Sequence, residues 1–203
     1  MLKPLTFLLC LVPFGYTVVQ IWLLQTGASH NLGADPGREL VLIQGSWAIR
    51  FLILTLMVSP LRRLTGWVRL TGIRRMLGLY TFFYASLHLL SWAFLLLELD
   101  PGRLGEELAE RPYISVGFLG WLLLVPLAVT SNAAMVRYLG RRWRHLHAVV
   151  YGIAVLAGLH VFWMVKSSYL EATIYGGLLG ILLVTRFFLG RFRIFQTALS
   201  TRV

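Results

Sequence analysis

The sequence predicts an all-α integral membrane protein, built as one bundle of six transmembrane helices. Of its 203 residues, 58% are hydrophobic and only 13% are charged, and the mean hydropathy is +0.74. A soluble domain of this length cannot bury so much apolar surface. Six apolar runs recur, each of about 20 residues and long enough to cross about 30 Å of hydrocarbon. Helices are expected because lipid cannot satisfy open backbone groups, and the short loops predict a single transmembrane domain over residues 1–203.

The first three spans are bounded by polar or charged stretches. The first follows Lys3 and ends at "QTGASHNLGADPGREL"; it is long for a signal peptide, so we expect a retained helix. The second ends at the basic loop "PLRRLTGWVRLTGIRR". The third ends at "ELDPGRLGEELAERPY", which has the pattern of a short amphipathic surface helix. Their expected bounds are roughly Leu5–Gln25, Leu42–Leu61 and Met76–Leu97.

The last three spans follow in the same way. The fourth runs from the acidic stretch to "TSN". The basic stretch "MVRYLGRRWRHLH" leads into the fifth, and the sixth ends at the basic tail "RFFLGRFRIFQTALSTRV". Their expected bounds are roughly Ile114–Thr130, Leu146–Lys166 and Thr173–Leu189.

The basic residues gather on one side of the predicted membrane. With the N-terminus inside, that side holds Lys3, Arg62, Arg63, Arg69, Arg74, Arg75, Arg137, Arg141, Arg142, Arg144, Arg186, Arg191, Arg193 and Arg202. The other side holds Arg38, Arg103, Arg111 and Lys166, and all eight acidic residues: Asp35, Glu39, Glu98, Asp100, Glu106, Glu107, Glu110 and Glu171. This positive-inside pattern predicts that both termini are cytoplasmic. The net charge of +11 therefore reflects topology rather than nucleic-acid binding.

Cysteine usage excludes one class of membrane enzyme. Cys10 is the only cysteine, so the chain has no CxxC pair and no disulfide framework. Enzymes that oxidise thiols in the membrane need cysteine pairs, and this chain is therefore not expected to be one of them.

Two histidines within the spans lie at the same distance from the basic side. His88 follows thirteen residues after Arg75, which closes the basic loop, and His160 follows thirteen residues after His147. At 1.5 Å per residue each step is about 20 Å. We therefore expect His88 and His160 at one depth in the outer half of the bilayer. His147 is expected near the inner face, together with Arg74 or Arg75.

Histidines from two helices at one depth are suited to bind one iron. Neutral imidazole is a good iron ligand, and a haem with two axial histidines suits electron transfer because it leaves no open position for substrate. We therefore predict that His88 and His160 hold a haem. Membrane histidines also serve as polar contacts between helices or as proton relays. His30, in a loop, and His145, on another side of its helix, are not expected to be ligands.

Several stretches resemble the ferric-reductase-like transmembrane family, which includes the NADPH oxidase cores. They are "LGADPGREL", "RRMLGLYTFFYASLHLLSW", "RPYISVGFLGW", "LAVTSNAAMVRYLGRRWRHLHAVVY" and "LHVFWMVK". The resemblance that they carry extends over nearly the whole chain. Within the family, the chain is most similar to the haem-binding membrane subunits of bacterial periplasmic methionine sulfoxide reductase systems.

The resemblance implies a haem b and leaves the inner site open. Family members carry two histidines on each of two helices and hold two stacked haems. Here His147 and His160 match one such helix, whereas the other has only His88, with Arg74 fourteen residues before it. The outer haem would bind His88 and His160. At the inner face, either His147 holds a second haem, or His147 helps Arg74 and Arg75 bind a quinone or FMN, which the resemblance also implies; alternatively, these arginines only set the topology.

The resemblance also implies the partners of an electron-transfer subunit in a bacterial inner membrane. The oxidase members append a flavin and nicotinamide domain, but no GxGxxG follows a strand here. Electrons would come from the quinone pool or from a soluble flavin reductase. They would pass to a periplasmic molybdopterin enzyme that reduces methionine sulfoxide in proteins. The acidic stretches Asp35–Glu39 and Glu98–Glu110 are the expected docking surface.

Two other classes of function remain open. A stand-alone ferric or cupric transmembrane reductase would use the same haem and need no partner protein. A proton-coupled transporter would use Arg50, His88 and His160 as relay groups and would bind no haem. Arg50 is costly within a membrane, and in the haem-binding classes it is expected to pair with a haem propionate.

Overall fold

The computed structural model describes residues 2–164 and 169–200, with side chains for residues 3–164 and 169–188. Six of its helices are long and apolar enough to cross a membrane: α1 (Leu2–Gln25), α2 (Pro36–Thr65), α3 (Thr71–Leu95), α5 (Pro112–Val129), α8 (Val150–Met164) together with the preceding α7, and α9 (Leu170–Ser200). The connecting elements are η1 (Val68–Leu70), α4 (Pro101–Glu110), α6 (Ala133–Leu139) and α7 (Arg141–Ala148). The described chain contains no strand. The predicted six-helix, multi-pass membrane bundle is therefore confirmed.

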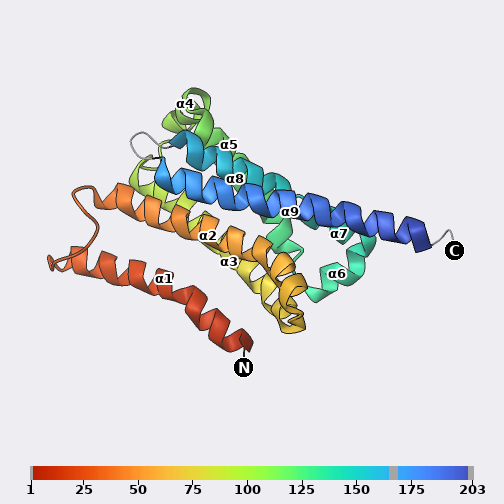
Figure 1. Ribbon diagram of the computed structural model, residues 1–203. Helices are drawn as coiled ribbons and strands as arrows, with labels where there is room; N and C mark the ends of the chain where they lie inside the picture. The colour runs from red at the N-terminus through yellow and green to blue at the C-terminus, as the bar shows by residue number, and fades with distance from the viewer. Residues whose placement is uncertain (1, 165–168, 201–203) are drawn as a thin grey trace.

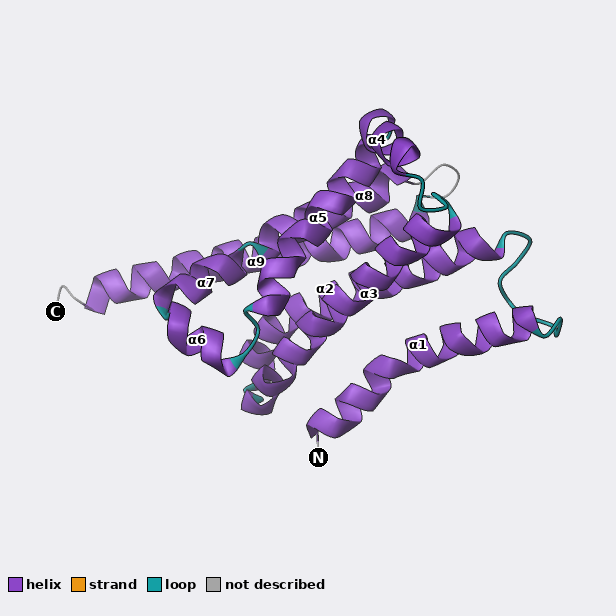
Figure 2. Ribbon diagram, turned by 180° about the vertical axis from the view of Figure 1, so that it is seen from behind, coloured by secondary structure: helices purple, strands orange, loops and turns teal. Residues whose placement is uncertain are grey.

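The bundle is built from two long helix pairs. α2 packs along α3, and α5 packs along α8, while α3 also contacts α5 (Figure 1). α9 lies against α8 and α2. Both views show α1 at the edge of the bundle (Figures 1 and 2). Its contacts are mainly with α3, and fewer are with α2. The two pairs therefore meet in the middle of the bundle.

Side-chain caps fix where several helices begin. The Asp35 carboxylate accepts a hydrogen bond from the backbone N–H of Arg38 at 3.1 Å, and Pro36 opens α2. Asp100 caps α4 in the same way, and Asn132 caps α6. Such caps satisfy backbone N–H groups that have no partner within the helix. α2 ends at Gly66, whose φ of 71° is a left-handed conformation that glycine adopts without strain.

The fifth predicted span departs from a single helix over Leu146–Lys166. α7 ends at Ala148 and α8 begins at Val150, so His147 and His160 belong to different helices. Trp143 anchors α7 to the end of α5, because its indole N–H donates to the Thr130 carbonyl at 3.0 Å. Periodicity could not reveal this break, since it depends on a contact with another helix. Lys166 lies outside the described residues.

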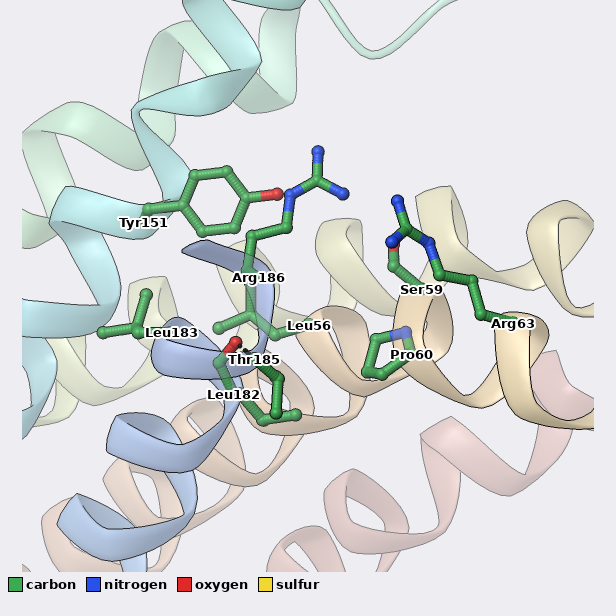
Figure 3. A pocket seen from close by; sticks show the side chains of 9 residues that line it. All are labelled: Leu56, Ser59, Pro60, Arg63, Tyr151, Leu182, Leu183, Thr185 and Arg186. Atoms are coloured by element: carbon green, nitrogen blue, oxygen red, sulfur yellow. Dashed lines mark hydrogen bonds between the residues drawn. The ribbon is translucent and has the colours of Figure 1, made fainter. Parts of the chain in front are cut away.

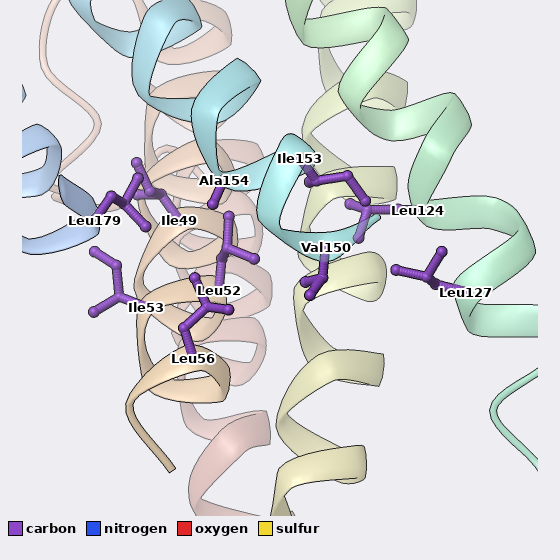
Figure 4. Packing of buried hydrophobic residues seen from close by; sticks show 10 residues of the cluster. All are labelled: Ile49, Leu52, Ile53, Leu56, Leu124, Leu127, Val150, Ile153, Ala154 and Leu179. Atoms are coloured by element: carbon purple, nitrogen blue, oxygen red, sulfur yellow. The ribbon is translucent and has the colours of Figure 1, made fainter. Parts of the chain in front are cut away.

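Apolar side chains from four helices form the centre of the bundle. Ile49 and Leu52 of α2 pack with Leu124 of α5, Ile153 of α8 and Leu179 of α9 (Figure 4). All five are less than a tenth exposed. Because lipid tails are as apolar as these side chains, such contacts stabilise the bundle through close packing rather than through escape from water.

A buried tyrosine ties α1 to α3. The Tyr84 hydroxyl donates to the Cys10 carbonyl at 2.7 Å and accepts from the Phe14 N–H at 3.0 Å. The Tyr84 side chain is fully buried. Tyr80, one turn away, donates to the Phe7 carbonyl at 3.0 Å. These bonds hold α1 against the bundle, beside the apolar cluster in which Cys10, Tyr80 and Tyr84 are buried.

The two ends of the bundle differ in charge. α1 begins and α9 ends on the side of α6 and α7, opposite the 26–35 loop and α4 (Figure 1). The acidic residues lie in the 26–35 loop, the first turn of α2, the segment around α4 and the first turn of α9. The acidic residues are thus gathered at one end, as predicted. We call the end with the 26–35 loop and α4 the acidic end, and the opposite end, with α6 and α7, the basic end.

Candidate functional site

His88 and His160 face each other between the two helix pairs. His88 comes from α3 and His160 from α8, and their ring centroids are 6.0 Å apart with an angle of 83° between the ring planes. The prediction that these histidines share one depth is therefore confirmed. Among the described residues no group of three or more His, Cys, Asp or Glu could hold a metal, so this site consists of a pair.

In both histidines the Nδ1 nitrogen is hydrogen-bonded to a backbone carbonyl of the protein. Nδ1 of His88 lies 2.8 Å from the carbonyl oxygen of Val41, and Nδ1 of His160 lies 2.7 Å from that of Tyr113. A carbonyl only accepts, so each Nδ1 carries the hydrogen and each Nε2 keeps its lone pair. Within the described chain no hydrogen bond engages either Nε2. This arrangement is typical of histidines that bind a metal through Nε2.

A glycine lies against each histidine ring. A methyl group on Gly45 of α2 would stand 2.9 Å from Nδ1 of His88, and one on Gly117 of α5 would stand 2.6 Å from Nδ1 of His160. Any larger residue would push the imidazole off its carbonyl partner. The two glycines therefore permit the close approach of α2 to α3 and of α5 to α8.

The two halves of the site repeat along the chain. In each half 47 residues separate the accepting carbonyl from its histidine. Val41, Gly45 and His88 recur 72 residues later as Tyr113, Gly117 and His160. The same offset places His147 opposite Arg75, a position where the first half has no histidine. The site is thus made of two equivalent helix pairs.

The histidines line a large open cavity of about 1320 Å³. Small-molecule sites usually measure about 300–1,000 Å³, so a cofactor as large as a haem has room here. A metal–imidazole bond of about 2 Å, added to the distance from nitrogen to ring centre, puts two imidazoles on one iron about 6 Å apart. The observed 6.0 Å matches this value. The residues present therefore fit a bis-histidine haem.

Arg50 lines the same cavity and is held by two neighbours. Its Nε donates to the Tyr175 hydroxyl at 2.9 Å, and its guanidinium carbon lies 4.8 Å from the Trp47 ring centroid. These contacts stabilise a cation that would be costly within a membrane. They leave the terminal guanidinium nitrogens available to an anionic group in the cavity.

His147 lies apart from the pair, at the basic end. Its Nε2 is 3.0 Å from the Thr130 hydroxyl, and its ring stacks on Trp143 with centroids 4.0 Å apart. Arg74, in the first turns of α3, is close enough for its charge to act on His147, as expected from the spacing, and Arg75 follows it. The structure thus brings His147 and Arg74 together but does not bring them to the cavity.

The other two histidines stand away from both groups. His30 accepts a hydrogen bond from the backbone N–H of Leu32 at 3.3 Å, and His145 is exposed on α7. Neither lines the cavity, as expected. Sequence reasoning did not find Gly45, Gly117 or the two carbonyls. The repeated spacing from glycine to histidine is the signal that could have revealed them.

The fold and the site define a class: multi-pass membrane bundles that present two histidines from different helices to one cavity. Residues 44–158 match the family described as "Ferric reductase like transmembrane component". The chain is 46% identical over 181 residues to the "Protein-methionine-sulfoxide reductase heme-binding subunit MsrQ" of Xanthomonas euvesicatoria pv. vesicatoria (strain 85-10), which covers 89% of this chain and 83% of that protein. It is also 46% identical to the MsrQ of Ralstonia nicotianae (strain ATCC BAA-1114 / GMI1000) over 183 residues, with 89% and 82% covered. The chain therefore belongs to the ferric-reductase-like transmembrane family and groups with the MsrQ subunits.

Proposed function

We propose that this chain is the haem-b-binding, electron-transfer subunit of a methionine sulfoxide reductase system and performs no substrate chemistry of its own. The observation that carries the proposal is the pair of His88 and His160, whose Nδ1 atoms are held by backbone carbonyls and whose ring centroids lie 6.0 Å apart in a common cavity. The names of the MsrQ relatives, which describe them as heme-binding subunits, support it.

In this proposal His88 and His160 would hold one haem b through their Nε2 atoms. The carbonyls of Val41 and Tyr113 hold each ring in the tautomer that offers Nε2. Arg50 supplies positive charge for a propionate at the wall of the cavity. A haem held there would supply a one-electron carrier. The protein's own part is to orient the two rings and to exclude other ligands.

The basic end is proposed to hold a second, anionic cofactor. His147, Arg74 and Arg75 offer a ring nitrogen and two cations, which suit either the phosphate of FMN or the propionates of a second haem. The bond between His147 Nε2 and Thr130 favours FMN, because this nitrogen is already engaged. The ratio of haem and flavin to chain distinguishes the two cofactors.

The separation of basic and acidic residues supports an orientation of the protein in the membrane, and the proposed direction of electron flow follows from that orientation. We place both termini and the basic end in the cytoplasm. Electrons would reach this single domain of residues 1–203 from the quinone pool in the membrane or from a soluble flavin reductase on the cytoplasmic side. The acceptor would be MsrP, a molybdopterin enzyme in the periplasm, docking on the acidic end. The protein would thus connect two compartments across a bacterial inner membrane.

The test is a reduced-minus-oxidised optical spectrum of the purified protein, with haem and flavin quantified per chain. We expect a low-spin b-type spectrum that disappears in His88→Ala and in His160→Ala. His145→Ala is the matched control, because this exposed histidine lies away from the cavity, and it should keep the spectrum. The absence of a Soret band after expression with ample haem would contradict the proposal.

A further inference from the structure

A second group of polar side chains lies away from the histidine cavity, at the basic end. It lines a shallow pocket between α2, α8 and α9 (Figure 3). Arg63 and Ser59 come from the last turns of α2, Tyr151 from α8 and Arg186 from α9. None of these residues lines the histidine cavity, so the proposed haem site leaves this pocket without a role.

The two arginines share the pocket without an acidic partner. Every Asp and Glu of the chain is among the described side chains, and the one ion pair found there joins Arg111 to Glu107 at the acidic end. Figure 3 shows the guanidinium groups of Arg63 and Arg186 on the same side of the pocket. Arg186 also lies over the Tyr151 ring, with its central carbon 5.5 Å from the centroid. Two neighbouring cations repel each other unless an anion from outside the chain joins them.

The pocket also offers hydroxyl groups. In the described part of the chain no hydrogen bond is found for the side chain of Ser59 or Tyr151, whereas Thr185 beside them bonds to the carbonyl of Leu182 at 2.9 Å. Hydroxyls and guanidinium groups are all hydrogen-bond donors. A ligand with several negatively charged oxygens can accept from all of them, and phosphate is the group that arginine pairs bind best.

The floor of the pocket is apolar. Leu56, Leu182 and Leu183 line it below the polar groups, toward the interior of the bundle (Figure 3). The enclosed space is only about 10 Å³, which holds one small atom group. A nucleotide or flavin ring therefore cannot enter, and a ligand must lie along the surface. An amphiphile with a phosphate at its polar end matches both the donors and the leucines.

We propose that Arg63 and Arg186, with Ser59 and Tyr151, bind the phosphate of an anionic phospholipid whose acyl chains lie against α9. Basic pockets between transmembrane helices at the cytoplasmic face bind lipid head groups of this kind. The lipid would join the end of α2 to α9, two helices whose basic ends carry like charges. The site does not depend on the haem.

The test is native mass spectrometry of the full chain after incubation with phosphatidylglycerol or with phosphatidylcholine. We expect the protein to retain one phosphatidylglycerol. Arg63→Gln combined with Arg186→Gln should weaken that binding at least about tenfold, because hydrogen bonds to charged groups are among the stronger ones. The matched control is Arg62→Gln combined with Arg69→Gln, which removes two exposed charges from the same end but outside the pocket and should leave binding unchanged.

Three outcomes would overturn the proposal. Equal losses in the two double variants would mean that the basic end attracts anions only through its overall charge. Equal retention of phosphatidylcholine would mean that the site does not select for the net negative charge of the phosphatidylglycerol head group. Competition by inorganic phosphate at millimolar concentration would show a phosphate site that ignores the acyl chains. The Soret absorbance is measured in every variant and should not change, which separates this site from the proposed haem site.

Discussion

Gly117 and His160 lie so close that a methyl group on the glycine would come within 2.6 Å of the imidazole Nδ1. The carbonyl of Tyr113, one helical turn earlier, receives the hydrogen of the same nitrogen at 2.7 Å. α5 therefore both orients the histidine and leaves space for it. The equivalent positions Gly45 and Val41 do the same for His88.

Gly117→Ala should weaken haem binding without unfolding the protein. Overpacking of this kind costs roughly 1–3 kcal/mol, which corresponds to about 5- to 150-fold in affinity. Alanine favours the helix over glycine, so a loss of haem cannot be attributed to a weaker α5. The measurement is haem titration of the purified variant, followed at the Soret band.

Gly120→Ala is the matched control for this change. It lies one turn further along α5 and lines the same cavity, but its methyl group would meet only Leu156 at an ordinary 3.8 Å. Haem affinity should stay within about twofold of the wild type, since contacts at this distance are not strained. A similar loss in both variants would contradict the role assigned to Gly117.

The sequence predicted the fold because membrane helices carry their signal locally. Each span needs its own apolar run, and the charged loops order the spans across the bilayer. The shared depth of His88 and His160 followed from equal spacing to the basic end, which requires only helix length. These predictions do not depend on which helices contact one another.

The contacts around the histidines could not be predicted in this way. Which face of α2 meets α3 depends on rotation and packing, so the roles of Gly45 and of the Val41 carbonyl became visible only in the structure. The same holds for the bond between Thr130 and His147 and for the break at Val149. Apart from the spacing of glycine and histidine that recurs 72 residues later, the sequence carries no local pattern for these long-range hydrogen bonds.

His147→Ala should spare the haem proposed at His88 and His160 and remove the cofactor proposed at the basic end. Loss of a hydrogen bond to a charged group weakens binding by about 10- to 150-fold. The measurement is the content of haem and flavin per chain. His147→Gln is the companion variant, because its amide can keep the contact with Thr130. Unchanged haem and flavin in His147→Ala would mean that no cofactor binds there.

Tyr84→Phe should loosen α1 from the bundle. The change removes one hydroxyl that serves both Cys10 and Phe14. Interhelical hydrogen bonds in membranes contribute about 0.6 kcal/mol on average and up to about 1.7, so the loss should be about 1–3 kcal/mol in the free energy of unfolding. Tyr80→Phe removes a single bond, to Phe7, and should cost about half as much. Denaturant unfolding in detergent measures both, and equal costs would contradict the bridging role of Tyr84.

Glu106→Gln combined with Glu110→Gln should slow electron transfer to MsrP, the proposed periplasmic partner. Both side chains are exposed on α4, whereas Asp100 caps that helix and Glu107 pairs with Arg111 at 2.9 Å, so of these four carboxylates Glu106 and Glu110 are free for docking. Complementary charges mainly raise the rate of encounter. We expect a rate about 3- to 10-fold lower at low salt, with the difference disappearing near 1 M salt, where the screening length falls to about 3 Å.

The measurement is the oxidation of the reduced protein by MsrP in stopped flow. Arg62→Gln with Arg69→Gln, at the other end, is the control, and equal rates in all three proteins would exclude the acidic end as the docking surface.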